Sequence, residues 1–168
     1  MSIIATDLKF FLSGGGENND PNASLGGAKS SVTITDNTLN NLFDDVSGTE
    51  HAAGDIEYRC LFVKNDSAET AYDVRVYISS NTPAADDSIK VGKDLTGVGD
   101  TADTVADENT APDPAVTFSL ATSYANGLLL GNMTTGQSYP IWIERTVVAG
   151  ATAQADNAAT IQAAVDTL

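Results

Sequence analysis

Alternation of side chains between two faces marks two segments of the chain as β-strands. It is strict in residues 72–78, whereas in residues 56–63 the second face holds Glu57 and Arg59 together with the apolar Leu61 and Val63. In residues 72–78 the apolar set faces one way, and it consists of Tyr72, Val74, Val76 and Ile78. In residues 56–63 one face carries Ile56, Tyr58, Cys60 and Phe62. A period of two is the pattern of a strand whose one face is buried, so both segments are predicted strands.

Further strands are predicted where shorter apolar patterns recur between turn residues. They lie at residues 3–12, around Val32 and Ile34, around Ile89 and Val91, and at 116–120, 138–148 and 160–166. Seven or eight strands at such intervals are typical of an all-β sandwich. The predicted core consists of Tyr58, Cys60, Phe62, Val74, Val76, Ile78, Phe118, Ile141 and Ile143.

The remaining segments have other patterns. Leu39, Leu42, Phe43 and Val46 recur at helical spacing after Asp36, a possible N-cap, which predicts one or two helical turns. Residues 48–54 are predicted to be loop. Residues 94–114 are acidic and poor in large apolar side chains. We expect this long loop to lie on the surface and to tolerate exchange of its Asp residues for Asn.

The N-terminal residues 1–31 form a segment unlike the sandwich domain expected over residues 32–168. Residues 13–31 are rich in Gly, Asn and Ser, a composition that builds no core by itself. They are interpreted as a flexible linker or as an extended arm ordered by a neighbouring subunit. The arm's expected assembly contacts are Leu8, Phe10, Phe11, Leu12 and Leu25. In the alternative interpretation, residues 3–12 are an edge strand of the same sandwich and residues 13–31 a loop.

Composition and charge narrow the class of protein. The chain has 168 residues, which suits one domain, and a net charge of −15. Such a negative surface repels phosphates and anionic lipid, so neither nucleic acid nor a membrane is an expected partner. Cys60 is the single cysteine, which excludes an intrachain disulfide. No secretory signal or membrane-spanning run is recognised, and we expect a soluble protein made in a cytoplasm.

Motifs for catalysis are missing from the sequence. His51 is the single histidine, in a segment that is predicted to be loop, and no phosphate-binding glycine motif occurs. We therefore expect no catalytic residue, no cofactor and no metal. The alternative is a calcium site in the acidic loop, with oxygen ligands from Asp100, Asp103, Asp107, Glu108 and Asn109, although their spacing matches no EF-hand.

Several stretches together carry a resemblance to a known class of proteins. They are Asp7-Leu-Lys-Phe-Phe-Leu-Ser-Gly-Gly, Asp20-Pro-Asn-Ala-Ser-Leu-Gly-Gly, Asn41-Leu-Phe-Asp-Asp-Val-Ser-Gly, Glu57-Tyr-Arg-Cys-Leu-Phe-Val-Lys-Asn, Tyr72-Asp-Val-Arg-Val-Tyr-Ile and Ile141-Trp-Ile-Glu-Arg-Thr-Val-Val-Ala-Gly. The set resembles small virion structural proteins of tailed bacteriophages, of the decoration or minor capsid type. The resemblance implies an immunoglobulin-like sandwich, a place in the virion, and contacts with the major capsid protein or other virion subunits. A homo-oligomer is expected as well.

Two other functions remain open on the sequence alone. The same sandwich could serve as a tail, neck or baseplate component. It could also be a host- or carbohydrate-binding module, with stacking platforms chosen from Tyr72, Tyr77, Tyr124 and Trp142.

Overall fold

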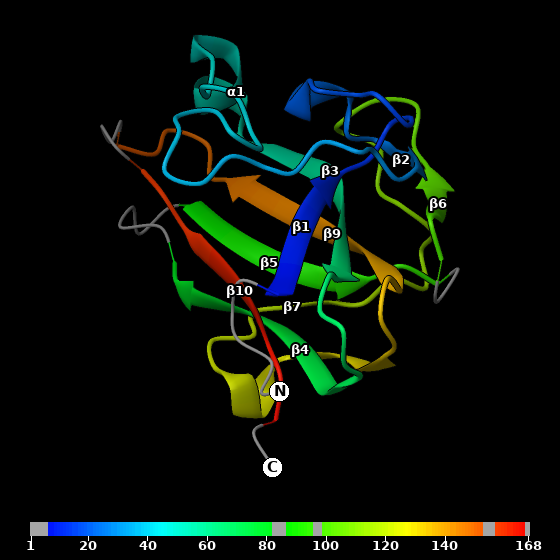
Figure 1. Cartoon of the computed structure of the whole chain (residues 1–168). Coiled ribbons are helices and arrows are strands. Elements are labelled where there is room, and N and C mark those ends of the chain that lie inside the picture. Colours follow the sequence, from blue (N-terminus) through cyan, green and yellow to red (C-terminus); the bar gives the residue numbers. More distant parts are fainter. Residues whose placement is uncertain (1–6, 82–86, 96–98, 153–156, 167–168) are drawn as a thin grey trace.

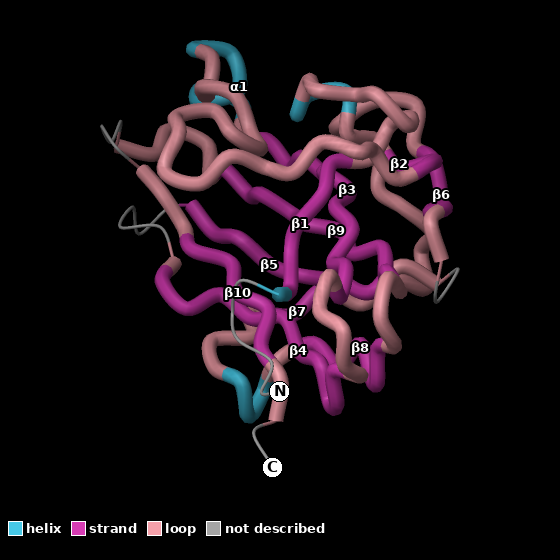
Figure 2. The backbone as a smooth tube through the Cα atoms, viewed as in Figure 1, coloured by secondary structure: helices cyan, strands magenta, loops and turns pink. Residues whose placement is uncertain are grey.

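The described part of the chain forms ten antiparallel strands in three sheets, with little helix (Figures 1 and 2). The computed structural model describes residues 7–81, 87–95, 99–152 and 157–166. The strands are β1 (Leu8–Leu12), β2 (Gly26–Ala28), β3 (Asp55–Asn65), β4 (Ala71–Ser80), β5 (Asp87–Lys93), β6 (Thr101–Thr104), β7 (Phe118–Ser119), β8 (Leu128–Met133), β9 (Ser138–Val147) and β10 (Thr160–Ala164). The helices are α1 (Gly48–Ala53) and the 3-10 turns η2 (Pro21–Ala23) and η3 (Tyr124–Asn126).

The sheets stack in layers around a five-stranded sheet in the order β1-β3-β9-β5-β7. One of its faces packs against the three-stranded sheet β10-β4-β8 and encloses the main core, which includes Leu61, Val74 and Ile141. Its other face is covered by the β2–β6 pair and nearby loops, which enclose a second core around Phe62 and Trp142. The chain is therefore an all-β protein with a sandwich-like arrangement, as the alternation predicts.

The two cores explain why β3 and β9 are apolar on both faces. Tyr58, Cys60 and Phe62 alternate into the second core, whereas Leu61 and Val63 alternate into the main core. β9 does the same, with Ile141 and Ile143 on one side and Trp142 on the other. The remaining predicted core residues are Val74, Val76 and Ile78, which lie in the main core, and Phe118, which is half-buried against the second.

The described part of the N-terminal segment, residues 7–31, lies on the chain's own sheet, which differs from the arm interpretation; residues 3–6 of the predicted first strand lie outside the described residues. β1 pairs antiparallel with β3 from Leu8 opposite Asn65 to Leu12 opposite Leu61. The other edge of β1 bonds to the following chain, since Leu12 N donates to Val32 O and Ile34 N donates to Phe10 O. The alternative interpretation, an edge strand followed by a loop, describes this arrangement.

All five side chains expected to be arm anchors pack within the chain itself. Leu8 and Leu12 are buried in the main core and Phe11 in the second core. Phe10 and Leu25 are partly buried against the same two cores. Leu8, Phe11 and Leu12 are therefore buried within the chain itself and are not available as anchors for a partner, which corrects the arm interpretation for these three residues.

Residues 13–31 form a loop that backbone hydrogen bonds hold to the rest of the chain, rather than a flexible linker. Gly14 N donates to Gly26 O at 2.8 Å, Ser30 N to Leu12 O at 2.8 Å, and Cys60 N to Ser24 O at 2.7 Å. Gly26 has φ +90°, and a Cβ there would lie 1.7 Å from Asp103 O, so only glycine permits the pairing of β2 with β6.

The 94–114 segment is less superficial than its acidity suggests. It contains β6, and Ala102 and Val105 are buried in the second core. Asp94, at its start, is only 1 % exposed. The side chains of Ala102 and Val105 pack against the five-stranded sheet. Part of the expected surface loop, residues 101–105, is therefore a layer that covers the second core; we call it the covering layer.

The predicted helical turns at residues 39–46 do not form, and a short helix follows them instead. Residues 36–46 form turns, and Leu39 is 79 % exposed, so the helical spacing there reflects no helix. The helix α1 occupies the expected loop instead. Ser47 caps it, since its hydroxyl accepts from Glu50 N while the Glu50 carboxylate accepts from Ser47 N. This capping box stabilises the short helix.

Tyr72 lies on the surface, which also differs from the alternation. A register shift interrupts β4 between Ala71 and Val74, and Asp73 has φ 49°. The extra residue at such a bulge shifts the preceding side chains by one position relative to Val74, Val76 and Ile78, which point into the core as predicted. Ala71 is buried in the main core in place of Tyr72, which is 50 % exposed.

Candidate functional site

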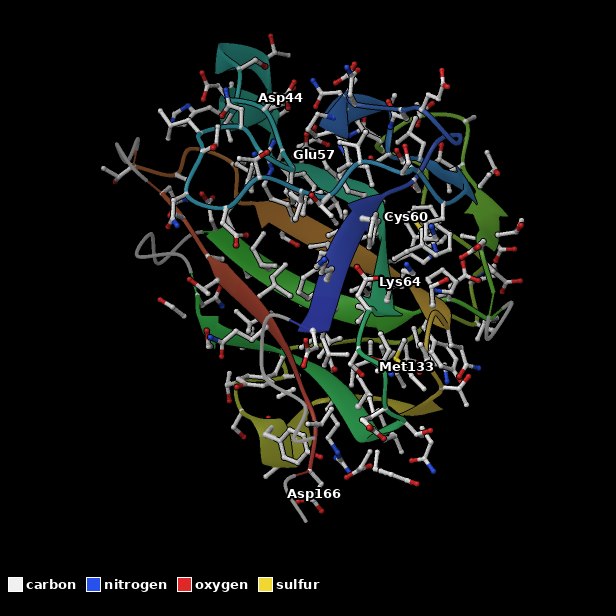
Figure 3. All side chains as sticks on the ribbon, viewed as in Figure 1. Asp44, Glu57, Cys60, Lys64, Met133 and Asp166 are labelled. Carbon is white, nitrogen blue, oxygen red and sulfur yellow. The ribbon has the colours of Figure 1, made fainter. Side chains whose placement is uncertain are left out.

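A group of interacting charged side chains lies where β3 and β9 meet the loop of residues 36–47. Glu57 on β3 and Arg145 on β9 are register partners and form an ion pair. Arg145 also donates from Nη1 to the Asp44 carbonyl at 2.7 Å. Figure 3 shows Asp44 above Glu57 at this end of the sheet.

A second ion pair joins the 105–110 loop to the same group. Arg59 is fully buried and pairs with Glu108, and its Nη2 donates to Asn22 Oδ1 at 3.1 Å. The ring of Phe43 lies near both guanidinium groups, with its centroid 5.4 Å from Arg59 Cζ and 4.8 Å from Arg145 Cζ. The charged cluster, defined as Asp44, Glu57, Arg59, Glu108 and Arg145, thus ties two loops to the five-stranded sheet, and the bond from Arg59 to Asn22 ties a third.

Burial controls the ionisation of the cluster's central carboxyl group. Glu57 is 1 % exposed, and desolvation raises its pKa above the ordinary value, although its hydrogen bond with Arg145 opposes the shift. Its Oε1 atom has no hydrogen-bond partner among the described residues. The cluster therefore holds one carboxyl group that favours a proton more than an exposed glutamate does.

Carboxylate oxygens of Asp44, Glu57 and Glu108 lie within 4.8 Å of one another, a spacing that a metal ion could use. Two guanidinium groups already engage these carboxylates, since Arg145 contacts Glu57 and Asp44, and Arg59 contacts Glu108. A divalent cation would have to displace them or lie beside them, and hard cations instead favour sites of oxygen ligands. The geometry fits a structural ion-pair network better than a metal centre.

We expect Glu57→Gln to change the pH dependence of stability in a defined direction. Between the unfolded and folded pKa values of Glu57 the folded protein binds more protons, so this residue's contribution to stability falls as pH rises. The wild-type free energy of unfolding minus that of Glu57→Gln should therefore decrease from pH ~4 upward, by at most ~1.4 kcal/mol per pH unit. Urea unfolding at several pH values measures this difference, and a constant or rising difference contradicts the assignment.

A buried carboxylate anchors the covering layer to the second core. Asp94 Oδ2 accepts hydrogen bonds from Trp142 Nε1 at 2.7 Å and from Asp103 N at 3.2 Å. The only tryptophan of the chain is thus both the largest fully buried side chain and a hydrogen-bond donor. It is unavailable as a stacking platform for a saccharide.

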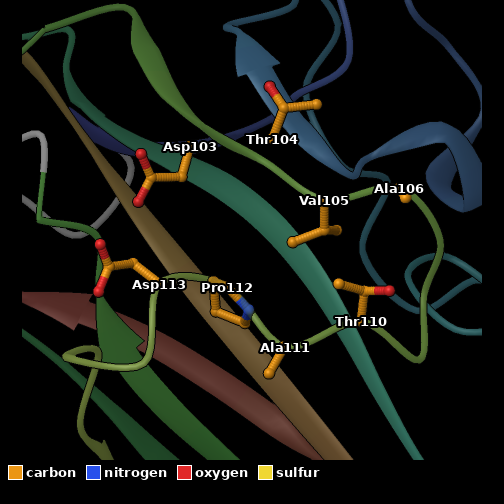
Figure 4. A pocket seen from close by; sticks show the side chains of 8 residues that line it. All are labelled: Asp103, Thr104, Val105, Ala106, Thr110, Ala111, Pro112 and Asp113. Carbon is orange, nitrogen blue, oxygen red and sulfur yellow. The ribbon is translucent and has the colours of Figure 1, made fainter.

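A small hollow among the described residues lies beside this layer. It has a volume of about 290 Å³, and Asp103 and Asp113 lie on one side of it (Figure 4). Desolvation and the charges of Asp94 and Asp113 raise the pKa of Asp103. A second hollow, of about 170 Å³, lies along residues 32–41. Both fall below the ~300–1,000 Å³ of ordinary small-molecule pockets.

The acidic loop does not gather the proposed calcium ligands. Asp100 accepts from the Ser138 hydroxyl, Asp107 from the Thr110 hydroxyl, and Asn109 donates to Asp55. Among the described residues, the single group of metal-ligating side chains close enough for one ion is the carboxylate set of the charged cluster, and of the expected loop ligands it includes only Glu108.

The two other reactive side chains are held in structural contacts. Cys60 is fully buried in the second core, and burial raises the pKa of its thiol far above the ordinary value, so it is a poor nucleophile. His51 on α1 forms a hydrogen bond with the carbonyl of Ala151, which joins the helix to the turn after β9. Neither residue faces a described hollow.

Three of the four tyrosine and tryptophan candidates for stacking lie near the three-stranded sheet. Tyr72 is 50 % exposed, and Tyr77 and Tyr124 are half-buried. The Tyr124 hydroxyl donates to the Asp73 carbonyl at 2.7 Å and to its carboxylate at 3.1 Å. The Tyr77 hydroxyl donates to Gln162 Oε1 at 2.9 Å.

Sequence reasoning missed the charged cluster, although one signal for it was present. Glu57 and Arg59 occupy positions on β3 that continue the face of Leu61 and Val63, which is buried. Charged residues on the buried face of a strand need partners of opposite charge. Their partners Asp44, Glu108 and Arg145 come from distant segments, which only the fold brings together.

No helix in the described ranges has both the length and the apolar character required to span a bilayer. The chain was also compared with models of protein families, with curated proteins and with solved structures. None of the three comparisons yields a match.

Proposed function

We propose that the chain is a non-enzymatic structural protein of a bacteriophage virion and that it acts through its surface. The observation that carries this proposal is that side chains which could bind or react are buried in structural contacts. Cys60, Trp142, Arg59 and Glu57 are all at most 1 % exposed, and each holds the sheet to a core or a loop. Catalysis needs an acid, base or nucleophile positioned at a substrate-sized cavity. Asp103 and Asp113 lie beside a hollow of about 290 Å³, which is smaller than ordinary small-molecule pockets, and neither Cys60 nor His51 lines it.

The internal ion pairs support a structural role of a particular kind. The charged cluster fixes long loops that have little regular structure onto a rigid sheet, so that their outer surfaces keep one shape. A protein that serves by contact needs such fixed surfaces, because ordering loops on binding costs free energy.

Within the virion, the proposed role is that of a capsid decoration protein with an immunoglobulin-like sandwich, as the sequence resemblance implies. Its partners would be the major capsid protein or other virion subunits, together with further copies of itself. Many weak contacts around a shell gain from multivalency, so that small stabilisations add up. The contacts would come from surfaces other than the side chains of β1, which the chain's own cores occupy.

Copy number in purified particles tests this proposal. Particles are isolated from a lysate of the source culture, and the chain is quantified by mass spectrometry against the major capsid protein. A decoration protein is expected in hundreds of copies per particle, whereas six or twelve copies would indicate the tail, neck or baseplate. Absence of the chain from particles would overturn the proposal altogether.

A further inference from the structure

The three-stranded sheet has an outer face that no described sheet covers. Val74, Val76 and Ile78 of β4 point into the main core, and Arg75 and Tyr77 alternate with them on the opposite face of the sheet. Tyr77 is half-buried there, and part of it also packs against that core. Their register partners share this outer face, namely Ala164 and Gln162 on β10 and Leu129 on β8. The five-stranded sheet, in contrast, is covered on both faces.

Side chains on this outer face are held in place before any partner arrives. The Arg75 guanidinium lies 5.5 Å from the centroid of Tyr124, and Tyr124 is bonded to Asp73 at the bulge. The Tyr77 hydroxyl on β4 donates a hydrogen bond to Gln162 on β10. Tyr and Arg are the residue types that contribute most to protein interfaces, and prior ordering lowers the entropic cost of binding.

The charge of this sheet sets it apart from the rest of the molecule. The chain carries −15, yet β8 and β10 contain no charged residue. β4 contains one acid, Asp73, and one base, Arg75, which pair with each other at 3.3 Å. The three strands together are therefore neutral.

Neutrality favours one partner over others. When a surface meets its own copy around a two-fold axis, the same patch lies on both sides of the contact, so any net charge on the patch would repel its copy. The rest of this chain is acidic and would repel a second copy or attract a basic protein. The neutral sheet is the surface on which two copies meet at the least electrostatic cost.

We propose that the outer face of the three-stranded sheet binds the same face of a second copy of this chain. This inference deepens the proposed function and rests on it, since it supplies the homo-oligomeric contact. Three strands of this length have a footprint of roughly 30 Å by 14 Å, on the order of 450 Å². Stable complexes bury about 800 Å² per partner, so the isolated dimer is weak and gains from high local concentration.

Sedimentation velocity of the full chain from ~1 μM to ~1 mM tests this contact, since weak interfaces dissociate in that range. We expect a dimer whose population rises with protein concentration. Its dissociation constant should fall as salt is added, because salt screens the repulsion between the acidic surfaces outside the three-stranded sheet. A chain that stays monomeric up to ~1 mM at high salt contradicts the proposal, whether the face serves another protein, a saccharide or nothing.

Two matched variants decide whether the sheet is the interface. Leu129→Lys places a charge on the outer face, where Leu129 is 48 % exposed, and Leu39→Lys makes the same change at a loop residue that is 79 % exposed. Both reduce the net negative charge, so a purely global effect would strengthen both dimers. We expect at least a ~10-fold weaker dimer for Leu129→Lys alone, with thermal unfolding as the check on folding. Equal dimerisation of both variants overturns the assignment.

The result is separable from the test of the proposed function. A chain that is present in particles but monomeric in solution refutes the sheet contact alone. A chain that dimerises through Leu129 but is absent from particles refutes the virion assignment alone.

Discussion

Deletion of residues 1–31 will leave a chain that does not fold. The deletion removes β1, which pairs with β3 over five residues, and it takes buried side chains out of both cores. Leu8, Phe11 and Leu12 are each at most 8 % exposed. Burying such a side chain contributes about 1.5–3 kcal/mol, so their joint loss is comparable to the ~5–15 kcal/mol that stabilises a whole domain.

Circular dichroism and thermal unfolding measure this effect directly. The truncated chain should show no cooperative unfolding transition. Lys9→Ala provides the control on the same strand, because Lys9 is exposed and its ion pair with Asp66 lies at the surface, where such pairs contribute ~0–1 kcal/mol. A truncated chain that melts near the wild-type temperature would restore the interpretation of this segment as a separate arm.

Trp142→Ala is expected to cost at least ~3–5 kcal/mol of unfolding free energy, the usual cost of truncating a buried aromatic side chain. Trp142 is fully buried in the second core, and no other fully buried side chain is larger. The substitution also removes the donor to Asp94, whose carboxylate is 1 % exposed. A buried acceptor that loses a partner adds about 1–3 kcal/mol to the cost.

Trp142→Phe separates the two contributions, since it keeps most of the apolar volume but cannot donate to Asp94. We expect it to lie between wild type and Trp142→Ala in urea unfolding followed by circular dichroism. Leu39→Ala is the exposed control and should stay within about 0.5 kcal/mol of wild type. A loss below ~1 kcal/mol for Trp142→Ala would contradict the second core as described.

The strands with the longest patterns could be predicted from the sequence because their side chains fill a core on a strict period. β3, β4 and β9 fall at the expected residues, and the two apolar faces of β9 reflect a sheet covered on both sides. Local pattern is sufficient there, since burial on each face follows directly from alternation.

The other elements depend on contacts that no local pattern records. β6 is short and lies in acidic sequence, and it is a strand because Gly26 lets β2 approach it closely. Tyr72 leaves the core because the backbone of Asp73 adds a residue to β4. The helix α1 could have been predicted, because Ser47 followed three residues later by Glu50 is the sequence pattern of a capping box. The glycines at its two ends indicated a loop instead.

The candidate site was beyond sequence reasoning for the same reason. Glu57 and Arg59 are two residues apart, but Arg145, Asp44 and Glu108 reach them only through the pairing of β3 with β9 and the return of two loops. The cluster's composition, three acids and two bases around Phe43, is a property of the fold.

The position of the chain in an intact particle tests its proposed role most directly. Electron cryomicroscopy of particles from the source culture should show density of this fold on the outside of the shell, seated on the major capsid protein and repeated with the shell's symmetry. Density of this fold in the tail would move the chain to another part of the virion. A particle map at side-chain resolution in which no density fits the five-stranded and three-stranded sheets would contradict the account.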